Sequence, residues 1–218
     1  MCAMSRTRLR LGLVIIFILT QALLGCGANV PTPCDAFLVP VFGNLLAAHS
    51  DPKLIESVVS TEFQVAPQDV RTSGLYLGGY IVQWSSGGRQ FYFEDAGKPR
   101  LKLKWTSMVP SLGRALECLG NPDFYQTNAF LQLDGRTTIS LFLWYEARSM
   151  FVAAGHYGPS TEFSSEDKIE YIAFADGNTR QERLIAAHTL GSPAGLLSMR
   201  SVRTWPGSLS GIVVESEP

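Results

Sequence analysis

The most reactive side chains in this sequence are four cysteine thiols, at positions 2, 26, 34 and 118. Cys26 directly follows Leu23-Leu24-Gly25, and its sulfur is the soft nucleophile that thioether formation requires. Cys34 and Cys118 form an even pair, so a disulfide between them and two separate buried thiols are the two alternatives. The cysteines and histidines form no CxxC motif or cluster, so the sequence predicts neither a metal site nor a cofactor.

The segment before Cys26 has the pattern of an export signal. Three arginines, Arg6, Arg8 and Arg10, precede an apolar run from Leu11 to Leu24. As a helix this run is about 21 Å long, against about 30 Å of hydrocarbon core, so it is too short to span a bilayer comfortably. We therefore interpret residues 1–25 as a cleaved signal peptide. The alternatives are an uncleaved single-helix anchor and an ordinary signal that a cysteine follows by coincidence.

Leu23-Leu24-Gly25-Cys26 resembles the bacterial lipobox, in which Leu, a small or aliphatic residue, and Gly or Ala precede the cysteine. The resemblance implies diacylglyceryl transfer to the Cys26 sulfur and cleavage between Gly25 and Cys26. Two or three acyl chains on Cys26 would hold the protein durably at a membrane, because one chain alone binds only marginally. We therefore expect an extracytoplasmic protein that is lipid-anchored to the bacterial cell membrane or the outer membrane.

The mature chain is a slightly acidic protein of one-domain size. Removal of residues 1–25 takes away three arginines and leaves 193 residues with 15 basic and 19 acidic side chains, a net charge of −4. This balance argues against nucleic acid as a partner. We expect residues 26–36 to be a lipid-anchored linker and residues 37–218 to be a single globular domain, with two modules of about 37–106 and 107–218 as the alternative.

Apolar patterns and cap residues predict an α+β fold, with antiparallel sheets packed by a few short helices. Asp51-Pro52 begins one helix, and Ser111 begins a second that stops at Gly120-Asn121-Pro122. Tyr80–Trp84 and Arg89–Glu94 flank a glycine turn and predict a hairpin. Leu101–Trp105 alternates with lysines, which predicts an edge strand whose lysines face water. Further strands are expected at 129–133, 138–145, 149–154, 169–174 and 212–214, and a helix at 179–189.

The helix exit Leu119-Gly120-Asn121-Pro122, followed by a run of strands, is similar to the modules of small outer-membrane assembly lipoproteins and of β-lactamase inhibitor proteins. Those modules carry a Leu-Gly-x-Pro helix exit that leads into an antiparallel sheet. The helix at Asp51 and the hairpin at 80–94 would form a diverged first copy, although they lack this exit. The resemblance implies a protein-binding scaffold rather than an enzyme.

Signals for catalysis are sparse. His156 has the best position, because it follows a predicted strand and precedes a long polar loop. Gly207-Ser208-Leu209-Ser210-Gly211 places a leucine where a serine elbow has its nucleophile. The remaining candidates are two histidines that pair with no other histidine in sequence and three carboxylates that fall in turns: His49, His188, Asp134, Glu146 and Asp176.

Three functions stay open, and we favour the first, a binding or assembly module with a protein partner in the cell envelope. The second is a binder of a small lipid or sugar, in a groove lined by the tryptophans at 84, 105, 144 and 205. The alternative for these tryptophans is that they fill the core. The third is a hydrolase with its site near His156. An apolar exposed sheet face would favour the first, a deep aromatic pocket the second, and a carboxylate or serine within hydrogen-bond distance of His156 the third.

Overall fold

The computed structural model describes residues 32–214, apart from residue 77 and the segments 132–136, 158–161 and 176–201. The signal peptide, Cys26, the expected helix at 179–189 and His188 lie outside the described residues. Within the described part, no helix combines the length and the apolar character of a membrane span.

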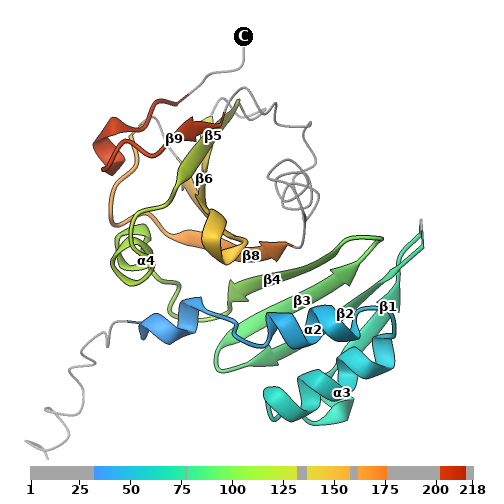
Figure 1. Ribbon diagram of the computed structural model, residues 1–218. Helices are drawn as coiled ribbons and strands as arrows, with labels where there is room; N and C mark the ends of the chain where they lie inside the picture. The colour runs from blue at the N-terminus through green and yellow to red at the C-terminus, as the bar shows by residue number, and fades with distance from the viewer. Residues whose placement is uncertain (1–31, 77, 132–136, 158–161, 176–201, 215–218) are drawn as a thin grey trace, which may run out of the picture. The chain divides into compact units, whose positions relative to one another are not determined.

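The predicted α+β class is confirmed: in the described residues, nine antiparallel strands form one sheet, and three short α-helices pack on it (Figure 1). The helices are α2 (Phe42–Ala48), α3 (Pro52–Glu62) and α4 (Leu112–Leu119). In their order across the sheet, the strands are β1 (Arg71–Gly74), β2 (Tyr80–Ser86), β3 (Arg89–Asp95), β4 (Pro99–Trp105), β8 (Ile169–Ala175), β7 (Met150–Tyr157), β6 (Thr137–Tyr145), β5 (Phe124–Leu131) and β9 (Arg203–Thr204). Short 3-10 turns include η1 (Cys34–Phe37) and η2 (Pro67–Asp69).

The order of elements repeats along the chain. α3 precedes the strands β1 to β4, and α4 precedes the strands β5 to β8. The last strands of the two sets, β4 and β8, pair antiparallel, with Leu101 opposite Phe174 and Leu103 opposite Ile172. We call α2, α3 and β1–β4 the first half, and α4 and β5–β9 the second half. Both halves belong to one compact unit that begins at Thr32.

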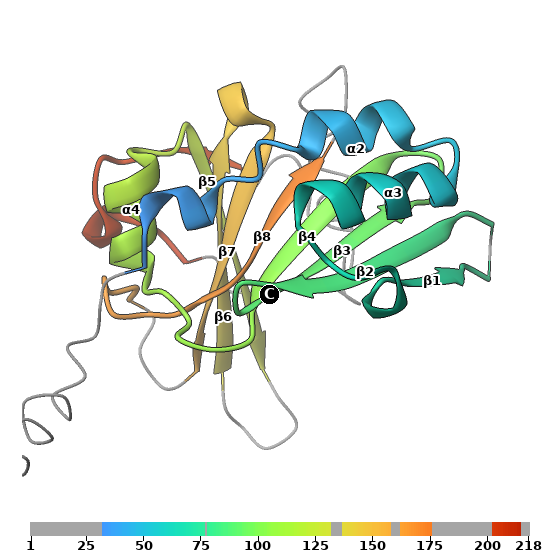
Figure 2. The same cartoon turned by 90° about the horizontal axis from the view of Figure 1, so that it is seen from below.

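The main core lies between the helices and one face of the sheet (Figure 2). α3 contributes Ile55 and Val59, which are fully buried. Because side chains alternate along a strand, one register keeps a whole row of apolar residues on this face. The row that crosses six strands consists of Trp84, Phe91, Leu103, Ile172, Val152 and Leu143.

Both predicted helix starts follow from their cap residues. The Asp51 carboxylate accepts a hydrogen bond from the Lys53 amide at 2.9 Å, and Pro52 is the first helical residue of α3. The Ser111 hydroxyl accepts one from the Arg114 amide at 3.2 Å at the start of α4. α4 ends at Gly120, whose φ of 79° is a left-handed conformation that favours glycine.

The prediction that the lysine-rich strand lies at an edge is wrong. β4 lies between β3 and β8, and Lys102 is only 8% exposed. Its ammonium lies 3.9 Å from the centre of the Tyr171 ring, so a cation–π contact with β8 replaces part of the water that an edge would have provided. Lys104 alone of the two lysines is exposed to solvent.

Two other strand predictions need correction. Residues 212–214 form no strand; instead the Val213 amide donates to the Tyr125 hydroxyl at 3.2 Å, which holds this segment beside β5. β5 begins at Phe124 rather than at residue 129. The prediction missed its first residues because the buried polar residues Gln126, Thr127 and Asn128 interrupt the apolar pattern. The edge strand β1, with all four residues exposed, was not expected.

The opposite face of the sheet differs between the halves. In the second half it carries a second apolar cluster, whose larger members are Phe142, Trp144, Phe151 and Tyr171. In the first half the corresponding row is polar. Across β2, β3, β4, β8, β7 and β6 this row reads Gln83, Tyr92, Lys102, Ala173, Phe151 and Trp144. Lys102 therefore lies at the border between a polar and an aromatic region.

Candidate functional site

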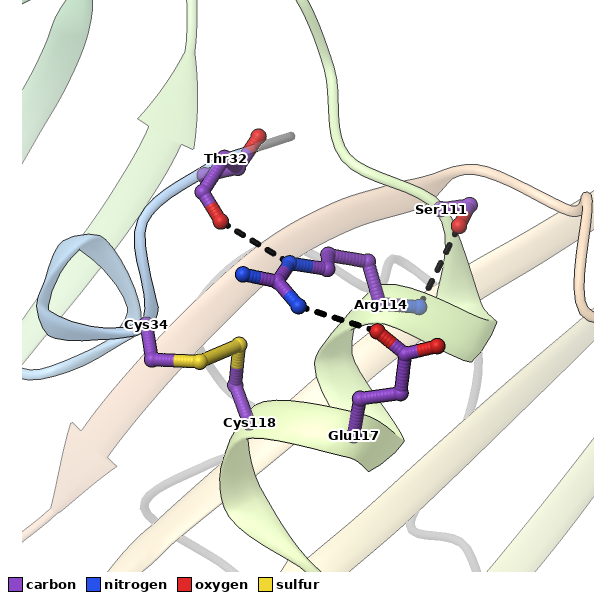
Figure 3. The surroundings of a disulfide bond; sticks show 6 residues. All are labelled: Thr32, Cys34, Ser111, Arg114, Glu117 and Cys118. Carbon is purple, nitrogen blue, oxygen red and sulfur yellow. Dashed lines mark hydrogen bonds and ion pairs between the residues drawn. A yellow bond between two sulfur atoms is a disulfide. The ribbon is translucent and has the colours of Figure 1, made fainter. Parts of the chain in front are cut away.

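The end of the expected linker, residues 26–36, is fastened to α4 (Figure 3). A disulfide joins Cys34 in η1 to Cys118 in α4, with their Cα atoms 5.0 Å apart and a sequence separation of 84. Arg114 Nε donates to the Thr32 carbonyl at 2.9 Å, and Arg114 Nη1 donates to Glu117 at 2.9 Å. We call Thr32, Cys34, Arg114 and Cys118 the N-terminal clamp. Together they fix the chain from its first described residue.

The first half of the molecule holds η1 as well. Arg89 Nη1 in β3 donates to the Ala36 carbonyl at 3.1 Å, and the Phe37 ring lies 5.6 Å from that of Trp105 in β4. Burial lowers the pKa of the Arg89 guanidinium, and the nearby Asp35 carboxylate acts in the opposite direction. η1 is thus bound to the second half through Cys34 and to the first half through Ala36 and Phe37, so the chain enters the body at a defined place.

His156 pairs with a carboxylate that the sequence did not single out. Its Nδ1 lies 3.0 Å from Asp167 Oδ1, with side chains 23% and 13% exposed. Because a carboxylate accepts hydrogen bonds, Nδ1 of the neutral imidazole carries the hydrogen and donates a hydrogen bond to Asp167. The lone pair of the neutral ring then lies on Nε2, which is the arrangement of a histidine base oriented by an aspartate.

The loop between β7 and β8 holds Asp167 in place. The Ser164 amide donates to Asp167 Oδ2 at 2.7 Å, and the Asp167 carbonyl accepts from the Leu112 amide of α4 at 2.6 Å. The Ser165 carbonyl accepts from the Gly113 amide at 2.9 Å. The first amides of α4 thus bind this loop, and His156, at the end of β7, lies across from it. A signal for the pair was present: both residues flank one connection between neighbouring antiparallel strands.

The pair lies in an open depression of about 470 Å³. Its lining consists of Gly155, His156, Glu166, Asp167, Lys168, Ile169 and Glu170. Among these described lining residues are a base, a lysine and three carboxylates, and none is a serine, threonine or cysteine. Their arrangement suits activation of a water molecule by His156 better than attack by a hydroxyl or thiol of the described lining.

The other predicted candidates that the structure describes do not line this depression. His49 Nδ1 lies 2.8 Å from Asp95 Oδ2, and the His49 carbonyl accepts from the Tyr80 hydroxyl, so this pair ties the end of α2 to the sheet. Burial, with Asp95 and Asp51 nearby, raises the pKa of Tyr80 to about 12. In the Gly207–Gly211 stretch the Ser208 and Ser210 hydroxyls bond each other at 2.9 Å. Asp134, Asp176 and His188 lie outside the described residues, and Glu146 begins a 3-10 turn.

The tryptophans pack in the core. Trp84 stacks on Phe91 with ring centres 5.1 Å apart, and Trp144 lies 4.9 Å from Phe151. Trp105 and Trp205 are partly buried against the main core. An apolar depression of about 440 Å³ is lined by the link between η1 and α2, and its two aromatic lining residues are Phe63 and Phe91. In the described segments, no group of three or more His, Cys, Asp or Glu side chains is arranged to hold a metal ion.

Comparisons with known proteins give no match: no family model, curated protein or solved structure is similar to this chain at a significant level.

Proposed function

We propose that this protein is a lipid-anchored extracytoplasmic module that binds a protein partner in the cell envelope. The observation that carries the proposal is the N-terminal clamp. The chain is bonded to the body at Cys34, eight positions after the cysteine of the Leu23–Cys26 motif. A structural disulfide belongs to an oxidising compartment outside the cytoplasm, as an export signal requires.

Binding rather than turnover fits the composition of the sites. The depression around His156 supplies a base, and none of its described lining residues carries a hydroxyl or thiol nucleophile. The helix exit at Leu119–Pro122, which resembles that of envelope assembly lipoproteins, lies on α4, the helix that receives the disulfide. A body tethered to an anchored cysteine by a few residues presents its surface close to the membrane.

The anchoring is tested by Cys26→Ser in the full chain. We expect the wild-type protein to fractionate with membranes and to carry acyl mass on its N-terminus, because the Cys26 sulfur accepts the diacylglyceryl group. Cys26→Ser should stay unprocessed or soluble. Cys2→Ser is the matched control, since it removes a cysteine outside the Leu23–Cys26 motif and should keep the acyl mass. A mature wild-type N-terminus without acyl mass would contradict the lipoprotein assignment.

The binding is tested by crosslinking in the native envelope. The acylated protein should capture one partner protein reproducibly, while the Cys26→Ser protein should lose that partner, because it no longer resides at the membrane surface. Equal recovery of all crosslinked proteins with both variants would argue against a specific partner.

A second candidate function, hydrolysis by a water molecule that His156 activates, is favoured by the hydrogen bond between His156 and Asp167. Its test is turnover of esters, glycans and peptides by His156→Ala, with His49→Ala as the matched control from the other His–Asp pair. The binding function predicts no turnover in any of the three proteins. Turnover by wild type and His49→Ala that is lost in His156→Ala would establish the hydrolase instead.

A further inference from the structure

Exposed apolar side chains gather near the N-terminal clamp. Met108 is 80% exposed and Val109 is 37% exposed, and both lie in the connection between β4 and α4. Leu38, directly after η1, is also exposed. The other large apolar side chains exposed within the described segments are dispersed, at Leu54 in α3, Tyr76 before β2 and Val213 near the C-terminus.

The connection that carries Met108 is adjacent to η1. At its start, Trp105 contacts Phe37 of η1, and beyond its end, α4 carries the disulfide to Cys34. The connection that carries Met108 and Val109 therefore runs between two contacts with η1.

The protein holds this connection in a conformation that turns its apolar residues outward. The Thr106 amide and hydroxyl both donate to the Gly88 carbonyl at 2.9 Å, and the Pro110 carbonyl accepts from the Ile169 amide at 3.2 Å. Between these two fixed points, Met108 has a φ of 47°, a left-handed conformation that few residues with a side chain adopt. The exposure of Met108 is thus a property of an ordered turn.

We propose that this connection rests in the interface of the bilayer that holds Cys26, with Met108 and Val109 entering the boundary between headgroups and acyl chains. The inference rests on the proposed anchoring. Six positions separate Cys26 from Thr32, and such a segment spans at most about 22 Å when fully extended. The clamp at Thr32 and Cys34 then keeps the adjacent turn within reach of the lipid headgroups.

The chemistry of the surface specifies the kind of lipid contact. Of the exposed charged residues near this turn, Asp35 and Glu117 are acidic and Lys104 is basic, so attraction to anionic headgroups alone does not explain the contact. Insertion of apolar side chains remains, and it depends little on lipid charge or salt. Docking of this turn would direct α4 toward the membrane and leave the β1–β2 end of the first half for a partner.

The experiment places one environment-sensitive fluorophore at Met108→Cys in the full, acylated chain. The introduced thiol is the one thiol left for labelling in the processed chain, because Cys2 leaves with residues 1–25, the anchor occupies Cys26, and the disulfide occupies Cys34 and Cys118. The label is measured in phosphatidylcholine vesicles with and without nitroxide-labelled acyl chains. Tyr76→Cys is the matched control. Tyr76 is fully exposed and lies between β1 and β2, at the β1 edge of the sheet. Val109→Cys repeats the test at the neighbouring residue.

We expect quenching at positions 108 and 109 to exceed that at 76 by about threefold or more, and to change little when anionic lipid replaces part of the phosphatidylcholine. Flotation of the protein with equal quenching at 76 and 108 would overturn the docking inference and leave the anchoring intact. Failure to float with vesicles would overturn the anchoring, and this inference with it. Shielding of position 108 in native envelopes but not in vesicles would assign the turn to a protein partner and also overturn the inference.

Discussion

The two halves of the molecule use the same order of elements but bury their sheets differently. In the first half, two helices, α2 and α3, cover one face, and the other face stays polar. The described segments of the second half contain a single α-helix, the eight-residue α4, and both faces of the sheet there carry buried aromatic residues. The comparison suggests that a short helix suffices where a disulfide and a second apolar face add stability.

The two halves also differ in what attaches to them. α4 binds the incoming chain through Cys118 and Arg114, and binds the β7–β8 loop through its first amides. α3 binds its sheet mainly through the apolar side chains of Ile55 and Val59. Attachment and the His156–Asp167 pair thus both depend on α4, so disturbance of this helix should affect more than packing.

The largest expected effect is loss of the disulfide. In residues 27–218, Cys34→Ser combined with Cys118→Ser should lower the free energy of unfolding by about 4 kcal/mol, because a bond across 84 positions restricts the unfolded chain. Hydrogen exchange should show that α4 amides lose more protection than α3 amides. Wild type under reductant is the control and should show the same loss of stability and of α4 protection as the double variant. Equal loss of protection in α3 and α4 would refute the special dependence of the second half.

A second substitution pair compares the rear faces of the halves. Phe151→Ala should cost about 3 kcal/mol, because the ring is 1% exposed and packs against Trp144 and Tyr171. Tyr92→Ala, from the same row in the first half, should cost about 1 kcal/mol or less, because Tyr92 is partly exposed. Urea unfolding measures both. Similar costs would mean that the polar and the aromatic rear faces contribute alike.

Lys102, at the border between the halves, should make stability depend on pH. Burial, assisted by the Lys104 charge, lowers the pKa of Lys102 to about 8, while Glu170 and Glu94 act in the opposite direction. Between this value and 10.5, the unfolded chain binds the proton that the folded chain has released, so the free energy of unfolding rises with pH. Relative to Lys102→Met, wild type should gain about 1 kcal/mol from pH 7.5 to 10, after allowance for solvent screening. An unchanged difference would place Lys102 in water.

Local signals in the sequence predict parts of this structure well. Asp51 and Ser111 mark the starts of α3 and α4, because capping depends on residues close in sequence. The burial of Lys102 was not predictable, since alternation gives the period of a strand but not its neighbours, and β8 lies far along the chain. His156 was selected correctly as a strand-end residue, whereas its partner Asp167 emerged only once β7 and β8 were paired.

The smallest expected effect separates the two helix caps. Asp51→Ala should cost about 1 kcal/mol, because its carboxylate is the side-chain acceptor for the Lys53 amide and complements the positive end of α3. Ser111→Ala should cost about half as much, since the Leu112 and Gly113 amides keep acceptors in the β7–β8 loop and the disulfide still holds α4. Thermal and urea unfolding of both variants measure the difference. A larger cost for Ser111→Ala would show that α4 depends on its own cap, and that the loop carbonyls, which also position Asp167, follow the helix rather than support it.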